Sequence, residues 1–363
     1  MNQDQLDYFF MSEALILAEK GNNACHPNPR VGAVIVKDNQ VISRGFHQKY
    51  GSKHAEVEAI LSCKDQKKLI NSTIYVTLEP CSHQGKTPPC VDLIIERKIS
   101  RVVVATLDPN PQVNGEGIKR LKMAGIDITI GILESQAKEL NLGFFSRILN
   151  NRPFIRSKIA SSFDGKTSLS NKVSKWITNK YSRENVQQIR AQSSAILTSY
   201  KTVNDDNPKL TVRSLPEDAQ PIRFIMDTHL KIDLDSDILK QKNVYVLHGV
   251  DLKEKPDVAA IFVKIKMNAS GLILSECMRL FQTMEINELL IEAGPGLNGV
   301  FLKNHLIDEL IAFQSPSVMG GQSNEMFNQP VLEDMKSKIN LKLQDQRFFN
   351  NDLRSIFRVS YVD

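Results

Sequence analysis

Three candidate metal ligands and one carboxylate stand close together in the first quarter of the chain. The sequence reads HAE from residue 54 and PCSHQGKTPPC from residue 80. One imidazole and two thiolates can bind a zinc ion and leave its fourth position open for water, as catalytic zinc sites require. The pattern therefore predicts zinc bound by His54, Cys81 and Cys90, with Glu56 able to reach the bound water.

The same four residues predict a deamination reaction. A histidine, two cysteines and a glutamate that does not bind the metal are the signature of zinc deaminases, although that signature has two residues between the cysteines. Bound zinc lowers the pKa of its water, and the resulting hydroxide attacks a ring carbon that carries an amino group. Glu56 would take the proton of the water and pass protons to the ring nitrogen and the departing ammonia.

A structural zinc site is the alternative interpretation. It would be of the Cys2His2 type, with His83 or His47 as the fourth ligand. Such a site needs no neighbouring carboxylate and usually takes its ligands from two close pairs. The other cysteines, Cys25, Cys63 and Cys277, lack such partners, and we expect them to be buried thiols.

Eight residues, SHQGKTPP, separate Cys81 from Cys90. If both cysteines bind one ion, this loop has to bulge over the mouth of the site. We therefore expect His83 and Lys86 to face the substrate, since a lysine ammonium group suits a phosphate. An ordinary lysine of a solvated loop is the alternative. Cys90 follows two prolines and is expected near a helix N-terminus, where partial positive charge favours its thiolate.

A second motif, GPGLNG, occupies residues 294–299 between the apolar run ELLIEA and a helical pattern. Such glycines let the backbone approach a pyrophosphate at a helix N-terminus. The sequence indicates no parallel βαβ run around the motif and no acidic residue about twenty positions further on, so a Rossmann unit is not expected. A plain strand-to-helix turn is the alternative.

Composition disfavours several classes of protein. The chain has 363 residues, enough for about two domains. Its 46 basic and 41 acidic residues are well mixed, and a net charge of +5 is too small to indicate a nucleic-acid surface. No apolar run has the length of a membrane helix, and the first residues show no signal-peptide pattern. We expect a cytoplasmic protein whose five cysteines are thiols or metal ligands.

Strand and helix patterns alternate along the chain, which predicts layered α/β domains. The segment NNRPF at residues 150–154 interrupts the alternation, so we place the domains at 1–149 and 150–363. Helices are expected at 6–20, 117–124, 134–149 and 181–191, from His54, from Pro88 and after the GPGLNG motif. Strands are expected at 73–78, 101–106, 126–132, 155–160, 195–199, 222–227, 243–249, 259–265 and 288–294, besides a hairpin at 31–47 and closing strands after residue 332.

Longer segments resemble one family. HPNPRVGAVIVKD, GFHQKYGSKHAEVEAI, YVTLEPCSHQGKTPPC and DPNPQVNGEGIKRLKMAGI resemble the deaminase half of the bacterial bifunctional riboflavin-biosynthesis deaminase/reductases, a family in which the longer cysteine spacing occurs. SKIASSFDGKTS, SKWIT, QIRAQSSAILTSYKTVNDDNPKLTVR, PIRFIMDT, LLIEAGPGLNGVFL and LIDELIAFQSPSVMGG resemble the reductase half. The resemblance implies a three-layer cytidine-deaminase-like domain and a dihydrofolate-reductase-like α/β domain that uses NADPH.

In the deaminase half, the resemblance implies contacts with the pyrimidine and the ribose phosphate from Asn28, His47, His83 and Lys86. It places Asp108 and Asn110 on a loop that borders the same site. Arg30 stands where a small or neutral residue is expected, which would affect the packing of its loop but not the chemistry.

In the reductase half, the resemblance implies two sets of residues. The NADPH site would be lined by Ala160, Trp176, Thr202, Asp206, Thr228, Gly294, Pro295, Gly296, Leu297, Asn298, Gly299 and Val300. The substrate would face Ser174, Arg190, Leu210, Arg213 and Glu292. Arg190 and Arg213 are candidate phosphate clamps, because guanidinium groups bind phosphate with two hydrogen bonds. Lys158 and Glu292 are candidates for handling the proton at the sugar during hydride transfer.

Some of these residues also have structural interpretations. Trp176 could belong to the core, and Asp205 and Asp206 could end a helix. Asn171 and Lys172 stand where the family often has Ser-Gly, and a lysine disfavours backbone conformations that glycine allows. We therefore expect a differently shaped loop over the nicotinamide.

These observations together predict a bifunctional enzyme of riboflavin synthesis. Its first domain would deaminate 2,5-diamino-6-(5-phosphoribosylamino)pyrimidin-4(3H)-one, and its second would then reduce 5-amino-6-(5-phosphoribosylamino)uracil to the ribityl product with NADPH. We also expect a homo-oligomer. One alternative is a nucleoside- or tRNA-editing deaminase, which the cysteine spacing and the lack of a basic stripe disfavour. The other is a scaffolding protein with structural zinc, which the intact Glu56 disfavours.

Overall fold

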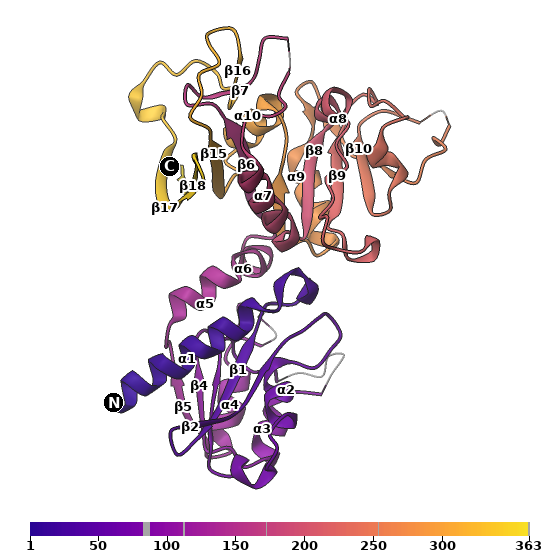
Figure 1. Ribbon diagram of the computed structural model, residues 1–363. Helices are drawn as coiled ribbons and strands as arrows, with labels where there is room; N and C mark the ends of the chain where they lie inside the picture. The colour runs from indigo at the N-terminus through magenta and orange to yellow at the C-terminus, as the bar shows by residue number, and fades with distance from the viewer. Residues whose placement is uncertain (83–87, 112, 172, 253, 362–363) are drawn as a thin grey trace. The chain divides into compact units, whose positions relative to one another are not determined.

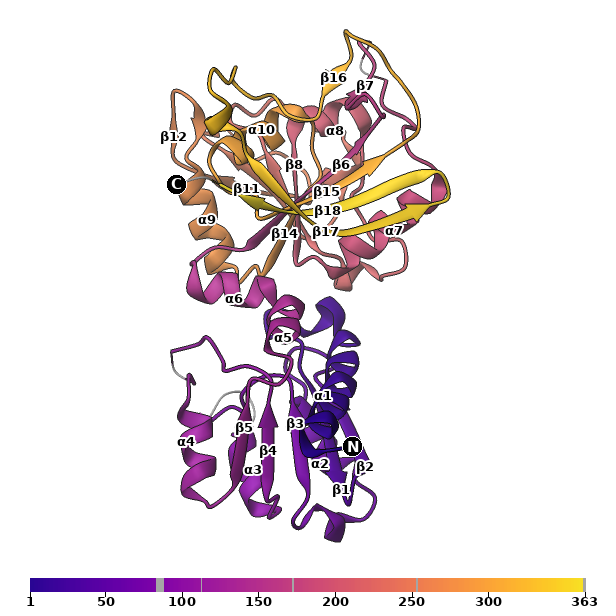
Figure 2. The ribbon, with the colours of Figure 1, turned by 90° about the vertical axis from the view of Figure 1, so that its left-hand side faces the viewer.

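The structure is a computed structural model that describes residues 1–82, 88–111, 113–171, 173–252 and 254–361. The chain divides into two compact units, Met1–Asn150 and Asn151–Asp363 (Figures 1 and 2). Each unit has one main β-sheet with helices on both of its faces, so the predicted pair of α/β units is confirmed. In the described part of the chain, no helix combines the length and the apolar character of a membrane span.

The sheet of the first unit has the strand order β2-β1-β3-β4-β5. β1 is antiparallel to β2 and β3, whereas β3, β4 and β5 run parallel. Asp38 and Asn39 have φ angles of 51° and 58° and close the predicted hairpin, since such residues tolerate this conformation. The elements are α1 (Gln3–Glu19), β1 (Gly32–Lys37), β2 (Gln40–Phe46), α2 (Ala55–Leu61), β3 (Thr73–Val76), α3 (Cys90–Glu96), β4 (Arg101–Val104), α4 (Glu116–Met123), β5 (Asp127–Ile130), α5 (Glu134–Leu140) and α6 (Leu142–Leu149).

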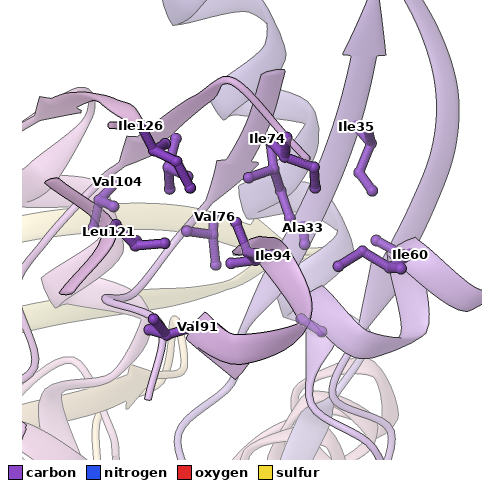
Figure 3. Close-up of a cluster of buried hydrophobic side chains, with 14 of the residues drawn as sticks. Ala33, Ile35, Ile60, Ile74, Val76, Val91, Ile94, Val104, Leu121 and Ile126 are labelled. Carbon is purple, nitrogen blue, oxygen red and sulfur yellow. The ribbon is translucent and has the colours of Figure 1, made fainter. Parts of the chain in front are cut away.

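This unit has three layers because successive strand residues face opposite sides of the sheet. Ala33 and Ile35 of β1 pack with apolar residues of α2, α3 and α4 (Figure 3). Val34 and Val36 pack with α1 and α5 on the other face. β1, with the sequence GAVIVK, is therefore almost completely buried, as a strand covered on both faces should be.

The helix expected at residues 134–149 is two helices. α5 and α6 meet at Asn141, whose side-chain amide binds the backbone of Arg30. Its Oδ1 accepts a hydrogen bond from the Arg30 N–H (2.8 Å), and its Nδ2 donates one to the Arg30 carbonyl (2.9 Å). Asparagine competes in this way with helical hydrogen bonding, so a pattern of apolar residues alone overestimates the length of the helix.

The second unit has a sheet with the strand order β11-β10-β9-β8-β14-β6-β15-β18-β17. The strands from β11 to β15 in this order are parallel, and β18 and β17 add an antiparallel edge. Helices α7 and α8 pack on one face, and α9 and α10 on the other. The elements are β6 (Phe154–Ser161), β7 (Lys166–Ser168), α7 (Lys180–Gln192), β8 (Ala195–Ser199), α8 (Tyr200–Asp206), β9 (Ile222–Met226), β10 (Val244–His248), β11 (Ile261–Lys264), β12 (Met267–Asn268), β13 (Gly271–Leu272), α9 (Leu274–Thr283), β14 (Glu288–Ile291), α10 (Pro295–Lys303), β15 (Glu309–Gln314), β16 (Asn324–Glu325), β17 (Asn340–Phe349) and β18 (Asp352–Ser360).

The GPGLNG motif lies in a parallel βαβ arrangement, which corrects the expectation from the sequence. β14 leads into the motif, α10 begins in it, and β15 then returns to the same sheet. Both strands pair in parallel with β6, which lies between them. Because β6 comes much earlier in the chain, this arrangement is not visible in the local sequence pattern.

The predicted closing strands are confirmed as the hairpin β17–β18, and this hairpin also caps a helix. The carboxylate of Asp352 accepts hydrogen bonds from the Asn179 N–H (2.7 Å) and the Ser182 hydroxyl (2.6 Å). Asn179 in turn donates to the carbonyl of Phe349 (2.7 Å). The C-terminal hairpin therefore fixes the N-terminus of α7, the helix that carries Arg190.

A buried ion pair joins α1 to the first sheet. Asp7 accepts hydrogen bonds from the Tyr75 hydroxyl (2.8 Å) and from both terminal nitrogens of Arg101 (2.8 and 2.6 Å). Burial opposes the charge of Asp7, but the hydrogen bonds outweigh burial and hold its pKa below the ordinary value of 3.8. Asp7 is therefore charged inside the unit at neutral pH.

We expect Asp7→Asn to lower the free energy of unfolding by about 3–5 kcal/mol near neutral pH, because Arg101 would lose its buried carboxylate and keep only Thr129 and the exposed Asp127 as partners. The contribution of Asp7 is complete above its unfolded-state pKa and disappears as the pH falls through the lower folded-state pKa, so the difference should shrink in acid. Urea titrations at several pH values measure it. Glu13→Gln, which breaks an exposed pair with Arg44, should cost less than about 1 kcal/mol, and equal losses for both variants would contradict this account.

Candidate functional sites

The three predicted metal ligands lie together in the first unit. His54 precedes the first residue of α2, Cys90 is the first residue of α3, and Cys81 follows β3. The Nδ1 atom of His54 is 3.5 Å from the sulfur of Cys81 and 3.4 Å from the sulfur of Cys90. All three ligand atoms lie within 4.8 Å of one another, so the set is close enough to hold one metal ion.

The surroundings of the two cysteines favour the deprotonated form of Cys81. A hydrogen bond from the Cys90 thiol, aided by His54, lowers the pKa of Cys81 to about 4. The N–H of Cys90 also points at the Cys81 sulfur, at 3.3 Å. The sequence had led us to expect that a helix N-terminus favours the thiolate of Cys90. The start of α3 instead favours the thiolate of Cys81. One imidazole with two sulfur ligands suits zinc.

Glu56 is the second residue of α2 and lies beside this set. Its side chain lines the same cavity as His54 and Cys81, although the residue is only 4% exposed. Burial raises the pKa of its carboxyl to about 7. The group can therefore be protonated or ionised near neutral pH, as the carrier of a proton must be.

The cavity beside the metal ligands has a volume of about 270 Å³ and brings together distant parts of the chain. Asn28 and His47 line it, and Asn28 Nδ2 lies 3.2 Å from His47 Nε2. His47 Nδ1 lies 3.0 Å from the carbonyl of Lys53, and burial lowers the pKa of its ring. Because both ring nitrogens have these partners, His47 is not a fourth metal ligand.

The other predicted residues of this site have different outcomes. Asp108 and Asn110 line the cavity, as the resemblance implied. His83 and Lys86 lie outside the described residues. Sequence reasoning missed Glu79 and Phe144, which also line the cavity. Glu79 directly precedes Pro80 and Cys81 in the sequence, and this position next to a predicted metal ligand could have indicated that it lies at the site.

A larger cavity of about 1480 Å³ lies in the second unit. The predicted residues that line it are Lys158, Ala160, Ser174, Trp176, Arg190, Thr202, Asp206, Leu210, Arg213, Thr228, Glu292, Gly294, Pro295, Gly296, Leu297 and Val300. Asn298 and Gly299 instead belong to the buried side of α10. Asn298 bonds Ser157 and the Ala293 carbonyl, and a Cβ atom on Gly299 would lie 2.2 Å from the Asn328 carbonyl oxygen. These two residues therefore hold the helix in place.

A charged triad occupies one wall of the larger cavity. Glu292 Oε2 is 3.1 Å from Lys158 Nζ, and Arg190 binds the same carboxylate through Nε (2.5 Å) and Nη2 (3.1 Å). Burial opposes the charge of Glu292, but Arg190 and Lys158 lower its pKa to about 2. Arg190 Nη1 donates to the carbonyl of Thr211 (3.1 Å), so this guanidinium is engaged on all its nitrogens. Arg190 is therefore not available to bind a phosphate, and Arg213 remains as the candidate for that role.

Trp176 is not part of the core, because 68% of the residue is exposed at the edge of this cavity. The guanidinium of Arg183 lies 4.4 Å from its ring centre. Asp206 ends α8, as its structural interpretation required, and also accepts a hydrogen bond from the Ser174 hydroxyl (3.1 Å). Lys172, which we expected to change the shape of the loop over the nicotinamide, lies outside the described residues.

Replacing a metal ligand should separate metal binding from folding. We expect Cys81→Ser to lose most bound zinc, because one of the two sulfur ligands is removed, while the fold is retained. Cys63→Ser is the matched control, since Cys63 is a buried cysteine of the same unit outside the ligand set. Zinc content by elemental analysis measures the effect, and equal zinc in both variants would contradict the ligand assignment.

Comparisons with known proteins give the family. Residues 4–106 match the family described as the cytidine and deoxycytidylate deaminase zinc-binding region. Residues 153–354 match the family described as the RibD C-terminal domain. The riboflavin biosynthesis protein RibD of Escherichia coli (strain K12) is 38% identical over 361 residues, which cover 96% of this chain and 98% of the relative.

Solved structures agree with this match. RibD of Acinetobacter baumannii (form 1) superposes with a TM-score of 0.91 at 37% identity, covering 99% of this chain and 100% of the other. A deaminase/reductase of Thermotoga maritima has a TM-score of 0.89 at 33% identity, with the same coverage. A zinc-binding deaminase domain and a reductase domain are thus both present, and the chain belongs to the RibD family of bifunctional deaminase/reductases of riboflavin biosynthesis.

Proposed function

We propose that the first unit deaminates 2,5-diamino-6-(5-phosphoribosylamino)pyrimidin-4(3H)-one with zinc, and that the second then reduces 5-amino-6-(5-phosphoribosylamino)uracil to the ribityl product with NADPH. The observation that carries the proposal is the buried Glu56 beside a His-Cys-Cys ligand set, of which His54 and Cys81 line the same cavity as Glu56. The Thermotoga maritima relative, which is named for a deaminase and a reductase acting on such compounds, supports the choice of substrates.

In the first unit, His54, Cys81 and Cys90 would hold the zinc ion, which supplies an activated water when bound. Glu56 would accept the proton of the attacking water and pass protons to the ring nitrogen and the leaving amine. The pKa of about 7 that burial gives Glu56 suits both steps. Asn28 and the residues near it would then orient the pyrimidine.

In the second unit, the start of α10 would receive the pyrophosphate of NADPH. A Cβ atom on Gly294 or Gly296 would have nothing within 4 Å, so the backbone there is open toward the cavity. The N–H groups and the dipole of a helix N-terminus favour a bound anion. Trp176 and Thr228, which line the same cavity, would contact other parts of the cofactor.

The charged triad would divide the work of proton transfer. Glu292 remains ionised at neutral pH because its pKa is about 2, so it has no proton to give. The ammonium group of Lys158 would donate a proton to the sugar in this reduction, for which bound NADPH would supply the hydride. Glu292 keeps the ammonium group in position, and Arg190 orients Glu292. Arg213 would bind the substrate phosphate.

Two substitutions should separate the activities in one assay that follows ammonia release and NADPH oxidation. Wild-type protein given the diaminopyrimidine and NADPH should release one ammonia for each NADPH oxidised. Glu56→Gln should retain zinc but lower ammonia release by about 10²–10⁴-fold, and NADPH oxidation with it. Lys158→Met should release ammonia normally without oxidising NADPH.

Other outcomes of this assay would contradict the proposal. Full ammonia release by Glu56→Gln would remove the proton carrier from the mechanism. Normal NADPH oxidation by Lys158→Met would show that the proton of the sugar comes from elsewhere.

We also propose that the protein forms homo-oligomers through its second unit. β17 lies at the edge of the nine-stranded sheet and exposes Leu341, Leu343 and Phe348. Long exposed edge strands with apolar side chains tend to pair with another chain. Light scattering should give a mass above the 40.9 kDa of one chain, and a monomer at assay concentrations would contradict the proposal.

A further inference from the structure

A second buried glutamate, Glu79, stands between β3 and the metal ligand Cys81. The residue is 4% exposed, and among the described residues its carboxylate receives hydrogen bonds from backbone N–H groups only. Oε2 accepts from Asp108 (3.3 Å) and Gly115 (2.9 Å). Oε1 accepts from Gly117 (3.0 Å) and Ile118 (3.3 Å), in the first turn of α4. One side chain thus satisfies four backbone donors on two segments.

Close packing also holds α4 against the segment that carries Cys81. A Cβ atom on Gly117 would lie 2.3 Å from the carbonyl oxygen of Pro80, so only glycine permits this approach of α4. One turn later, Arg120 Nη1 donates to the carbonyl of Ser82 (2.8 Å). Contacts from α4 therefore surround Cys81 on both sides along the chain.

These contacts connect Cys81 to another part of the lining of the cavity. The loop after β4 carries Asp108 and Asn110, which line the deaminase cavity. Asp108 Oδ1 accepts a hydrogen bond from the Asn110 N–H (2.8 Å), while the Asp108 N–H is bound by Glu79. The position of this part of the lining relative to Cys81 is therefore set by the carboxylate of Glu79.

We propose that Glu79 is a positioning residue for substrate binding in the deaminase cavity, an inference that rests on the proposed function of the first unit. It acts through Asp108 and Asn110 and leaves metal binding to its neighbours. A carboxylate is required because it only accepts hydrogen bonds, and both of its oxygens face donors. A glutamine would turn its NH2 group toward two N–H groups and displace one segment.

Glu79→Gln should therefore raise the KM of the deaminase about tenfold or more, while kcat changes by less than about threefold and zinc content stays the same. A change confined to KM indicates lost binding, not a lost chemical step. Zinc content, KM and kcat are measured on the full-length zinc-loaded protein with the diaminopyrimidine as substrate. An unchanged KM, or a loss of zinc, would overturn the inference.

Asp7→Asn is the matched control, since Asp7 is an equally buried carboxylate of the same unit that lies outside the cavity lining. It should lower stability and leave KM unchanged. If both variants raise KM equally, general loosening of the unit explains the effect and the positioning role is wrong.

Two further results keep the test decisive. If Glu79→Gln does not fold, Glu79→Asp keeps an acceptor-only group at a shorter reach, and it should raise KM with zinc retained. An Asp variant with wild-type KM would contradict the inference. If the wild-type protein releases no ammonia, the proposed function itself fails, which is a separate outcome from a wild-type enzyme whose KM does not depend on Glu79.

Discussion

A charge that is buried away from water must find partners inside the protein, and this constraint organises both cavities. Glu292 meets it with Lys158 and Arg190, which together lower its pKa to about 2. Glu79 meets it with backbone N–H groups of two segments. In each case the partners come from separate elements, so satisfying the charge also fixes where those elements lie.

Glu56 is a buried carboxyl group with few such partners, and its pKa is raised as a result. Burial raises its pKa to about 7, whereas Arg190 and Lys158 lower the pKa of Glu292 to about 2. Backbone N–H groups point at both oxygens of Glu79. A carboxyl group that is costly to ionise is suited to exchanging protons, and one that is held ionised is suited to holding other groups in place. The fold thus gives three buried glutamates different chemical tasks through their surroundings.

The parallel parts of the two sheets explain where the cavities form. β3 and β4 run in the same direction, so the segments that follow them, with Cys81 and Asp108, emerge at one edge of the sheet. β14 and β8 in the second unit do the same, and Glu292 directly follows β14. Ligands bind at this edge of parallel sheets because the loops there can vary without disturbing the core.

Local patterns predicted much of this protein, since they depend on residues close together in the chain. The hairpin at residues 31–47, the helix that begins after His54 and the closing strands all follow from turn residues and apolar spacing. Errors occurred where a distant partner intervened. Asn141 divides a predicted helix because it binds the backbone of Arg30, and the GPGLNG motif has parallel neighbours because β6 inserts between β14 and β15.

The residue types and spacing by themselves predicted the candidate metal ligands, which the structure brings together, and the glutamate beside them, because that chemistry requires particular side chains. Tertiary structure alone decided that Arg190 serves Glu292, that Asn298 and Gly299 support α10, and that Glu79 joins two walls of a cavity. These roles depend on which groups meet in space. The partners of Glu79 are backbone N–H groups, which every residue except proline carries, so no sequence pattern could reveal them.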